Sequence, residues 1–315
     1  MNILITAIGS YSVSTVIKSL KLDKRFDKFF GCDIYPKEWH YITKEFDQVF
    51  LAPYVTEENK YLKFIQDIII DNDIKIIIPS TDIEVDFFNK HRNYFKNTLI
   101  TIGSEQFIKI ARDKYLLSEF LNSNNFKVPN TYTYDQLNDA KFPLIGKPKN
   151  GRSSEGIIRL KDISDLGTNQ SYDNYIFQEF LQGNVVTVDI INDIKKGITV
   201  SIPRKELIRT SNGAGMTVEM FYDDKLNTLV KEISNKIGAF GAFNMEFIIN
   251  ENEYFLIDIN PRFSAGIGFT QFLGYNYVVN TINYYLQEKI ETQIEYQNFI
   301  LQKRMEEVLN ETITK

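Results

Sequence analysis

Short apolar runs alternate with amphipathic stretches through the first hundred residues, and this alternation most constrains the fold. The apolar runs lie at 2–7, 29–34, 48–51, 75–79 and 98–102, and helix-like stretches lie at 12–22 and 61–71. Such alternation predicts an α/β domain whose parallel sheet is joined by crossover helices. The first turn carries only Gly9 of a dinucleotide-binding fingerprint, although Asp33 stands where a ribose-binding acid would lie. A dinucleotide-dependent oxidoreductase is therefore one alternative, with an incomplete fingerprint.

Composition excludes several other classes of protein. The chain has 315 residues, and 36 basic against 41 acidic side chains give a net charge of -5. Because no basic stripe stands out, nucleic acid is not an expected partner. No apolar run approaches the roughly 20 residues of a membrane helix, and the N-terminus lacks a basic leader, so we expect a cytoplasmic protein. One cysteine, Cys32, and two histidines exclude an internal disulfide and an ordinary zinc site.

The remaining pattern predicts a mixture of helices and strands. We expect helices at 104–123, with Ser104 as N-cap, at 224–240 and at 275–287. Strands are expected at 175–183, in a hairpin at 184–192 and 197–205, and in a strand pair at 243–249 and 253–259. Periodicity does not separate strand from helix in the tail at 296–307.

An acidic strand is the first sign of chemistry. Asp258 and Asn260 stand two positions apart, so both side chains project from one face, and Arg262 follows a proline. A carboxylate and an amide oxygen suit Mg²⁺, and an arginine beside them suits phosphate. The turn at 250–252 places Glu246 on the neighbouring strand. An ordinary half-buried strand is the alternative interpretation.

A glycine-serine loop follows a strand that contains a lysine. The segment at 142–158 predicts strand, loop and strand, and no P-loop sequence is present. The loop offers Gly151, Ser153, Ser154 and Gly156, whose backbone and hydroxyl groups could bind phosphate oxygens. Lys147 stands in the preceding apolar strand, where an ammonium needs an anion. A plain hairpin loop is the alternative.

These motifs resemble the ATP-grasp ligases, most closely their carbamoyl-phosphate-synthase-like branch, which includes the ligase of pyrrolysine biosynthesis. The strongest match is Asn244-Met-Glu-Phe247 followed by Asp258-Ile-Asn-Pro-Arg-Phe263. The resemblance implies an α/β fold, with α+β character in the lid: a Rossmann-like domain at 1–103, then the ATP-grasp fold. Within the latter, a lid subdomain with its linking helix would span 104–181, and a metal- and ATP-binding subdomain 182–315.

The same resemblance implies roles for individual residues. Glu246, Asp258 and Asn260 would hold Mg²⁺, and Arg262 and Lys147 would be the catalytic cations. Lys114 and Lys147 would meet the phosphates of ATP. Adenine would be bound by a segment of four residues: Gln178, Glu179, Phe180 and Leu181. Its backbone and carboxylate would meet the adenine edge, and its apolar side chains would sandwich the ring.

The ribose contact is a departure from the family pattern. Val185 stands where many members have a ribose-binding glutamate, so Asp189 or Asn184 could take over that contact. A solvent-facing position on the strand is the alternative interpretation of Asp189.

The implied reaction is ADP-forming ligation. Phosphoryl transfer from ATP to a small-molecule carboxylate would give an acyl phosphate, which an amine or another nucleophile then attacks. One or two Mg²⁺ ions would assist, with Mn²⁺ as a substitute, and a homodimer is a conceivable assembly. A non-catalytic ATP-binding subunit is the main alternative. The acceptor carboxylate could meet the loop at 79–84 or one of four basic residues, each of which also reads as a surface charge: Arg204, Lys205, Arg209 and Arg304.

Overall fold

The first hundred residues form a five-stranded parallel sheet, as the alternation predicts. The computed structural model describes residues 1–151, 155–167, 171–304 and 306–309. In the first sheet, β1 (Asn2–Thr6), β2 (Phe29–Asp33), β3 (Gln48–Leu51), β4 (Ile74–Ile78) and β5 (Leu99–Ile100) lie in the order β3-β2-β1-β4-β5. Successive strands are added on one side of β1 up to β3 and on its other side from β4 onward. Such a switch in a parallel sheet leaves a crevice at the carboxyl ends of the two strands that flank it, here β1 and β4. There, the Ser10 hydroxyl donates to the Ser80 carbonyl at 3.4 Å.

Side chains of the first sheet alternate between two hydrophobic cores. Ile3 and Ile5 pack with helix α1 (Val13–Lys21), whereas Leu4 packs in the core that contains side chains of α2 (Glu58–Asp71) and α3 (Asp82–Lys90). This two-sided burial explains why the strands read as continuous apolar runs. Cys32 lies within β2 with no exposed surface, and burial raises its pKa, as do the nearby Glu84 and Asp33.

The predicted long helix at 104–123 is two helices. α4 (Glu105–Arg112) ends at Asp113, and α5 (Lys114–Ser123) begins there, because the Asp113 carboxylate accepts from the amides of Tyr115 and Leu116. An aspartate that caps a new helix in an extended conformation interrupts the old one. Ser104 caps α4 by accepting from the Phe107 amide, as predicted.

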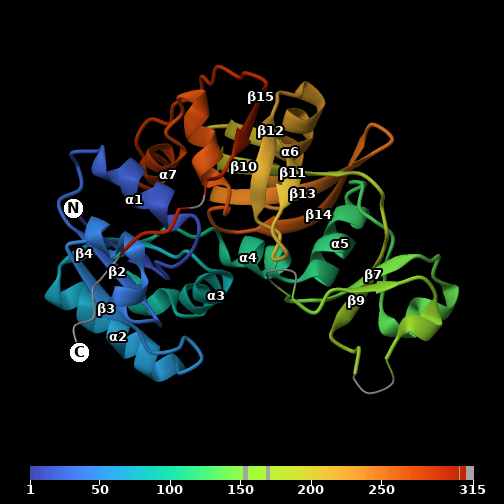
Figure 1. Cartoon of the computed structure of the whole chain (residues 1–315), viewed down its shortest axis with the longest axis horizontal. Helices are drawn as coiled ribbons and strands as arrows, with labels where there is room; N and C mark the ends of the chain where they lie inside the picture. Colours follow the sequence, from blue (N-terminus) through green and yellow to red (C-terminus); the bar gives the residue numbers. More distant parts are fainter. Residues whose placement is uncertain (152–154, 168–170, 305, 310–315) are drawn as a thin grey trace.

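A small antiparallel sheet follows these helices. It contains β6 (Thr131–Tyr132), β9 (Tyr175–Glu179), β7 (Leu144–Pro148) and β8 (Ile158–Leu160), in that order. Its own core is built around Leu144 and Phe177. Figure 1 shows this sheet as a separate lobe, in green, on the side of the molecule away from the first sheet.

The largest sheet has six antiparallel strands. β14 (Glu253–Asn260), β13 (Gly241–Asn250), β10 (Asn184–Asp193), β11 (Ile198–Arg209), β12 (Gly215–Met220) and β15 (Phe299–Gln302) pair in that order. Within the tail left open between strand and helix, residues 299–302 form a strand, β15. Val188 of β10 packs in the core that contains side chains of α6 (Asp224–Lys236), and Ile191 packs in the core that contains those of α7 (Tyr277–Tyr285). In Figure 1 this sheet lies between the other two lobes.

Candidate active site

The predicted acidic strand pair has the expected register. Glu246 of β13 lies directly opposite Asp258 of β14, and Asn244 lies opposite Asn260. Opposed residues of an antiparallel pair project from the same face, so the two carboxylates and Asn260 share one face of the sheet. Asn260 donates from its amide nitrogen to the Asn244 side-chain oxygen at 3.1 Å. The strand pair therefore presents two carboxylates and an amide together.

This donor set fits a hard divalent cation by its chemistry. Glu246 and Asp258 are 21% and 24% exposed, so they are reachable from the cavity without being free in solvent. Across the described part of the chain, no group of three or more histidine, cysteine, aspartate or glutamate residues could hold a metal ion. The oxygen set here has two carboxylates, and its third member would be the Asn260 amide. Such oxygen ligands suit Mg²⁺ better than softer metals.

Cations accompany both carboxylates. Lys114 donates to Asp258 at 3.1 Å and to the Gly151 carbonyl at 3.3 Å. Arg209 donates to Glu246 at 2.8 Å. The predicted metal and phosphate residues of α5, β13 and β14 are thus close neighbours, and Arg209 of β11, which was predicted for the acceptor carboxylate, lies beside them.

Lys147 approaches the same strands from the small sheet. Its ammonium donates to the Ile257 carbonyl at 3.3 Å. Burial lowers the pKa of Lys147 to about 8, while Asp258 acts in the opposite direction. A lysine held this way gains from an anionic ligand, since an anion compensates for the lost hydration.

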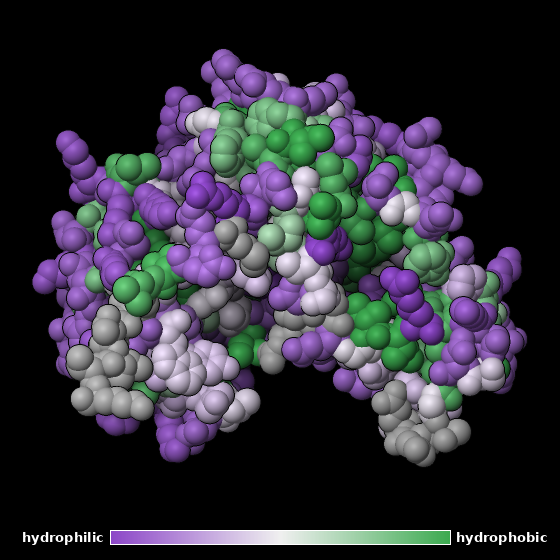
Figure 2. Space-filling view, in the orientation of Figure 1, coloured by the Kyte–Doolittle hydropathy of each residue, from purple (hydrophilic) through white to green (hydrophobic). Residues whose placement is uncertain are grey.

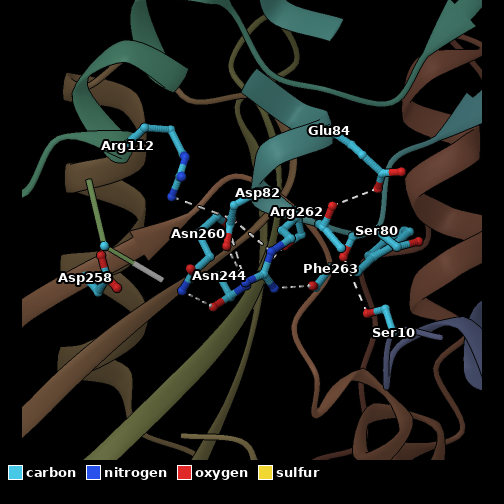
Figure 3. Close-up of polar contacts among 12 residues, drawn as sticks. Ser10, Ser80, Asp82, Glu84, Arg112, Asn244, Asp258, Asn260, Arg262 and Phe263 are labelled. Carbon is cyan, nitrogen blue, oxygen red and sulfur yellow. Dashed lines mark hydrogen bonds and ion pairs between the residues drawn. The ribbon is translucent and has the colours of Figure 1, made fainter. Parts of the chain in front are cut away.

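Arg262 is held by a residue of helix α3, which follows β4 of the first sheet. Its guanidinium donates to the Asp82 carboxylate through Nε at 2.9 Å and Nη2 at 2.8 Å. Figure 3 shows the two side chains pointing toward each other, with Arg112 approaching from the other side of Asp82. Burial alone would raise the pKa of Asp82, but Arg262 and Arg112 outweigh it, so the pKa is lowered.

A cavity of about 780 Å³ connects these groups. Its lining comes from all three sheets: the loops after β1, β2, β3 and β4, the end of β7, and the polar face of the six-stranded sheet. Figure 2 shows the surface hollowed between the lobes of the first sheet and the small sheet. The cavity includes these predicted site residues: Lys114, Lys147, Gly151, Glu246, Asp258, Asn260 and Arg262.

Other predicted nucleotide residues lie outside this lining. Gln178 is buried and donates to the Thr131 hydroxyl at 3.0 Å, and Glu179 accepts from Asn130 at 2.9 Å. Phe180, Leu181 and Gly156 do not line the cavity either. Ser153 and Ser154 lie outside the described residues. The cavity therefore brings together the residues predicted to bind the metal and the phosphates, but it does not include those predicted to bind adenine.

Asp189 is not where the prediction needs it. Its side chain is 1% exposed and forms an ion pair with Arg204, and it does not line the cavity. Arg204 also donates to Glu206 at 3.0 Å and to the Ser264 hydroxyl at 3.2 Å. The solvent-facing interpretation of Asp189 is wrong, and this buried, paired position gives no support to the ribose contact. The strand register buries Asp189 against the arginine of β11.

The basic residues suggested for an acceptor carboxylate also have partners. Arg204 and Arg209 line the cavity but are paired with carboxylates, as described above. Lys205 pairs with Glu219 at 2.9 Å outside the cavity, and Arg304 is 83% exposed. Thr81 ends the predicted acceptor loop, because Asp82 begins α3.

Sequence reasoning missed three features of this site. Asp82 pairs with Arg262 across about half of the chain, and Arg112 approaches the same carboxylate. Thr187 lines the cavity opposite Glu246. The acidic residues in the first turn of α3 are visible in the sequence, but the sequence does not show that Asp82 pairs with Arg262. Such long-range pairs need the fold before they can be named.

Comparisons with known proteins identify the domain that carries this site. Residues 111–266 match the ATP-grasp domain family, and the chain therefore contains an ATP-grasp domain. Over 194 residues it is 24% identical to the carbamoyl phosphate synthase large chain of Thermoanaerobacter pseudethanolicus, covering 55% of this chain and 18% of that protein. Tyramine–L-glutamate ligase of Methanocaldococcus jannaschii is 25% identical over 166 residues, covering 52% of this chain and 47% of that protein.

A solved structure shows the same fold over nearly the whole chain. The biotin carboxylase domain of Hydrogenobacter thermophilus 2-oxoglutarate carboxylase, in complex with MgADP, ADP and bicarbonate, superposes with a TM-score of 0.76. The sequences are 15% identical, and the match covers 93% of this chain and 72% of that one. The predicted ATP-grasp fold after a parallel α/β domain is thus confirmed. The chain spans under half the length of both sequence relatives above.

None of the described helices combines the length and hydropathy that crossing a bilayer requires.

Proposed function

We propose that this protein is an ATP-dependent carboxylate–amine ligase that releases ADP. The observation that carries the proposal is the convergence of Glu246, Asp258 and Asn260 with Lys114 and Arg262 on one cavity. Oxygen donors beside cations are the arrangement that positions a nucleotide triphosphate for phosphoryl transfer. Relatives and structural neighbours in the ATP-grasp family support ATP and Mg²⁺ in general, including one neighbour in complex with MgADP.

Glu246, Asp258 and Asn260 would hold Mg²⁺ in this proposal. When bound, the ion would polarise the phosphoryl group and neutralise part of its charge. Because both carboxylates already face Lys114 and Arg209, these cations are placed to turn to the phosphates. Mn²⁺, which has similar oxygen preferences, is proposed as a substitute.

The cations share the remaining charge. Asp258 acts on Lys147, whose pKa is lowered by burial, and a phosphate next to the ammonium would compensate for its lost hydration. Arg262 would face the transferred phosphoryl group, since it lines the cavity beyond the acidic strand pair. These residues bind and orient, and they stabilise charge that develops during transfer.

The acyl phosphate proposed as intermediate must be protected from water. The cavity extends from the acidic strands to the loops of the first sheet, where a carboxylate and an amine could both be enclosed. Exclusion of water there would favour attack by the amine over hydrolysis. We propose that the segments 1–103, 104–181 and 182–315 supply the acceptor end, the lid and the metal end, respectively. A homodimer remains part of the proposal.

ADP release against a panel of carboxylates, each with and without amines, tests the function. We expect ADP only when a suitable carboxylate is present, and an amide product only when the amine is also added. Asp258→Asn should remove this ADP release, because it deletes one charge of the metal set. A protein that binds Mg·ATP but releases no ADP with any pair would favour the non-catalytic alternative. A dinucleotide-dependent oxidoreductase would leave the acidic strand pair and its cations without a role, so the ligase accounts for more of the cavity.

A further inference from the structure

An ion pair between Asp82 and Arg262 connects helix α3 of the first domain to the residues that follow β14. Asp82 is the first residue of α3, whereas Arg262 follows β14, so 180 positions separate the two partners. Both oxygens of Asp82 accept from the guanidinium, which makes the contact bidentate. A bidentate pair fixes the plane of an arginine as well as its distance.

The carboxylate of Asp82 is buried and is not used by its own helix. It is 4% exposed, and Thr81, the N-cap residue, makes no side-chain cap. Arg112 approaches Asp82 at 3.8 Å and pairs with Asp86, one turn further along α3, at 3.0 Å. Asp86 is 47% exposed, and the contacts recorded for the described residues include none between Asp86 and Arg262. Asp82 and Asp86 thus differ in the arginine that each holds: Asp82 binds Arg262, and Asp86 binds Arg112.

Arg262 retains donors for a ligand after these contacts. A guanidinium has five N–H groups, and here Nε and Nη2 each donate to Asp82 and Nη1 donates to the Phe263 carbonyl at 3.1 Å. Two N–H groups therefore remain, and Arg262 lines the cavity. Their direction is set by the Asp82 pair, because rotation of the guanidinium would break both of its bonds (Figure 3).

We propose that Asp82 is a positioning residue that orients Arg262 toward the transferred phosphoryl group. The inference rests on the proposed function and assigns part of the reaction centre to the first hundred residues. Asp82 acts through Arg262 and touches neither the nucleotide nor the reacting atoms. The competing interpretation is an ion pair that only fastens α3 to the end of β14.

The test uses Asp82→Asn, Asp82→Glu and the matched control Asp86→Asn in the full chain. ADP release with Mg²⁺ is measured with the carboxylate and amine that the panel identifies. Misplacing a catalytic group by about 1 Å can cost about 100-fold, so we expect kcat to fall by about that factor in both Asp82 variants. KM for ATP should stay near the wild-type value, and Asp86→Asn should match wild type.

Two further measurements separate positioning from stability. Thermal unfolding shows whether Asp82→Asn folds; if it does not, Asp82→Glu decides, since it keeps the charge and moves it by one methylene. Arg262→Ala is then combined with the Asp82 variant. Positioning through Arg262 requires that the Asp82 substitution lowers kcat no further once Arg262 is absent.

Each result decides the inference. Equal kcat in the Asp82 and Asp86 variants, or a loss in Asp82→Glu that appears only as lower stability, would overturn it while leaving the ligase proposal intact. An additive loss on the Arg262→Ala background would also overturn it. Wild-type protein that releases no ADP with any pair refutes the proposed function and this inference with it.

Discussion

Replacing Arg204 by methionine should destabilise the protein far more than the same change at its neighbour Lys205. The Arg204 side chain is 2% exposed and faces two carboxylates, Asp189 and Glu206, which are 1% and 2% exposed. Lys205 pairs with Glu219, and these side chains are 27% and 36% exposed. The two variants therefore compare a buried and an exposed ion pair at adjacent positions of one strand.

The expected magnitudes follow from what each substitution leaves behind. Arg204→Met leaves two carboxylates buried without their main counter-charge, which costs about 3 to 5 kcal/mol in comparable cases. Burial, together with the nearby Arg204, lowers the pKa of Lys303 to about 8, and Lys303 lies near the same carboxylates. Its partial compensation favours the lower figure, about 3 kcal/mol. An exposed pair such as that of Lys205 contributes about 0 to 1 kcal/mol.

Urea unfolding followed by circular dichroism measures both values. A lower midpoint with an unchanged slope would report lost stability rather than a changed unfolded state. Equal stability of the two variants would refute the reasoning.

Three other perturbations test the site and its surroundings. Gly266→Ala should lower the free energy of unfolding by about 1 to 3 kcal/mol, as measured by thermal unfolding, because an added Cβ would lie 2.6 to 2.8 Å from the Arg204 guanidinium. Gly167→Ala is the control, since its added Cβ would lie 3.5 Å from the nearest atom and should change stability little. The affinity for Mg·ATP, measured by calorimetry, should depend on the charge of Lys147, whose pKa is about 8. It should be constant below about pH 7 and fall about fivefold between pH 8 and pH 9, because the ammonium loses its proton there. Lys147→Arg should flatten that profile and Lys149→Arg should not; a flat wild-type profile would contradict the assignment. Mg·ATP at about 100 times its Kd should stabilise the fold by about 2.7 kcal/mol, and EDTA should abolish most of the rise in melting temperature; no rise would count against an ATP site.

Local sequence patterns predicted the metal end of the site, because that end is built from neighbours in sequence. Asp258 and Asn260 share a strand, and a short turn places Glu246 opposite them, so alternation and turn length were enough. The same logic placed Lys147 on a strand before a loop. Their individual roles stay predictions until the variants are measured.

Pairings between distant segments were not predictable in this way. Nothing near Asp82 in the sequence shows that it meets Arg262, 180 positions away. Asp189 and Arg204 lie on the two strands of the predicted hairpin, but the sequence pattern did not give the register that brings them together. The break at Asp113 had a local signal, since aspartate favours N-caps, but the flanking apolar periodicity concealed it. Periodicity reports which face is buried, whereas register between strands decides which charges meet.

The single cysteine offers a built-in reporter of local opening. Cys32 has no exposed surface and a raised pKa, so a thiol reagent should react with it only when β2 separates from its neighbours. Its labelling rate would then measure how often the first sheet opens, separately from the six-stranded sheet. A ligand that bridges the two sheets should slow this labelling even where it leaves the spectroscopic signal of the folded protein unchanged.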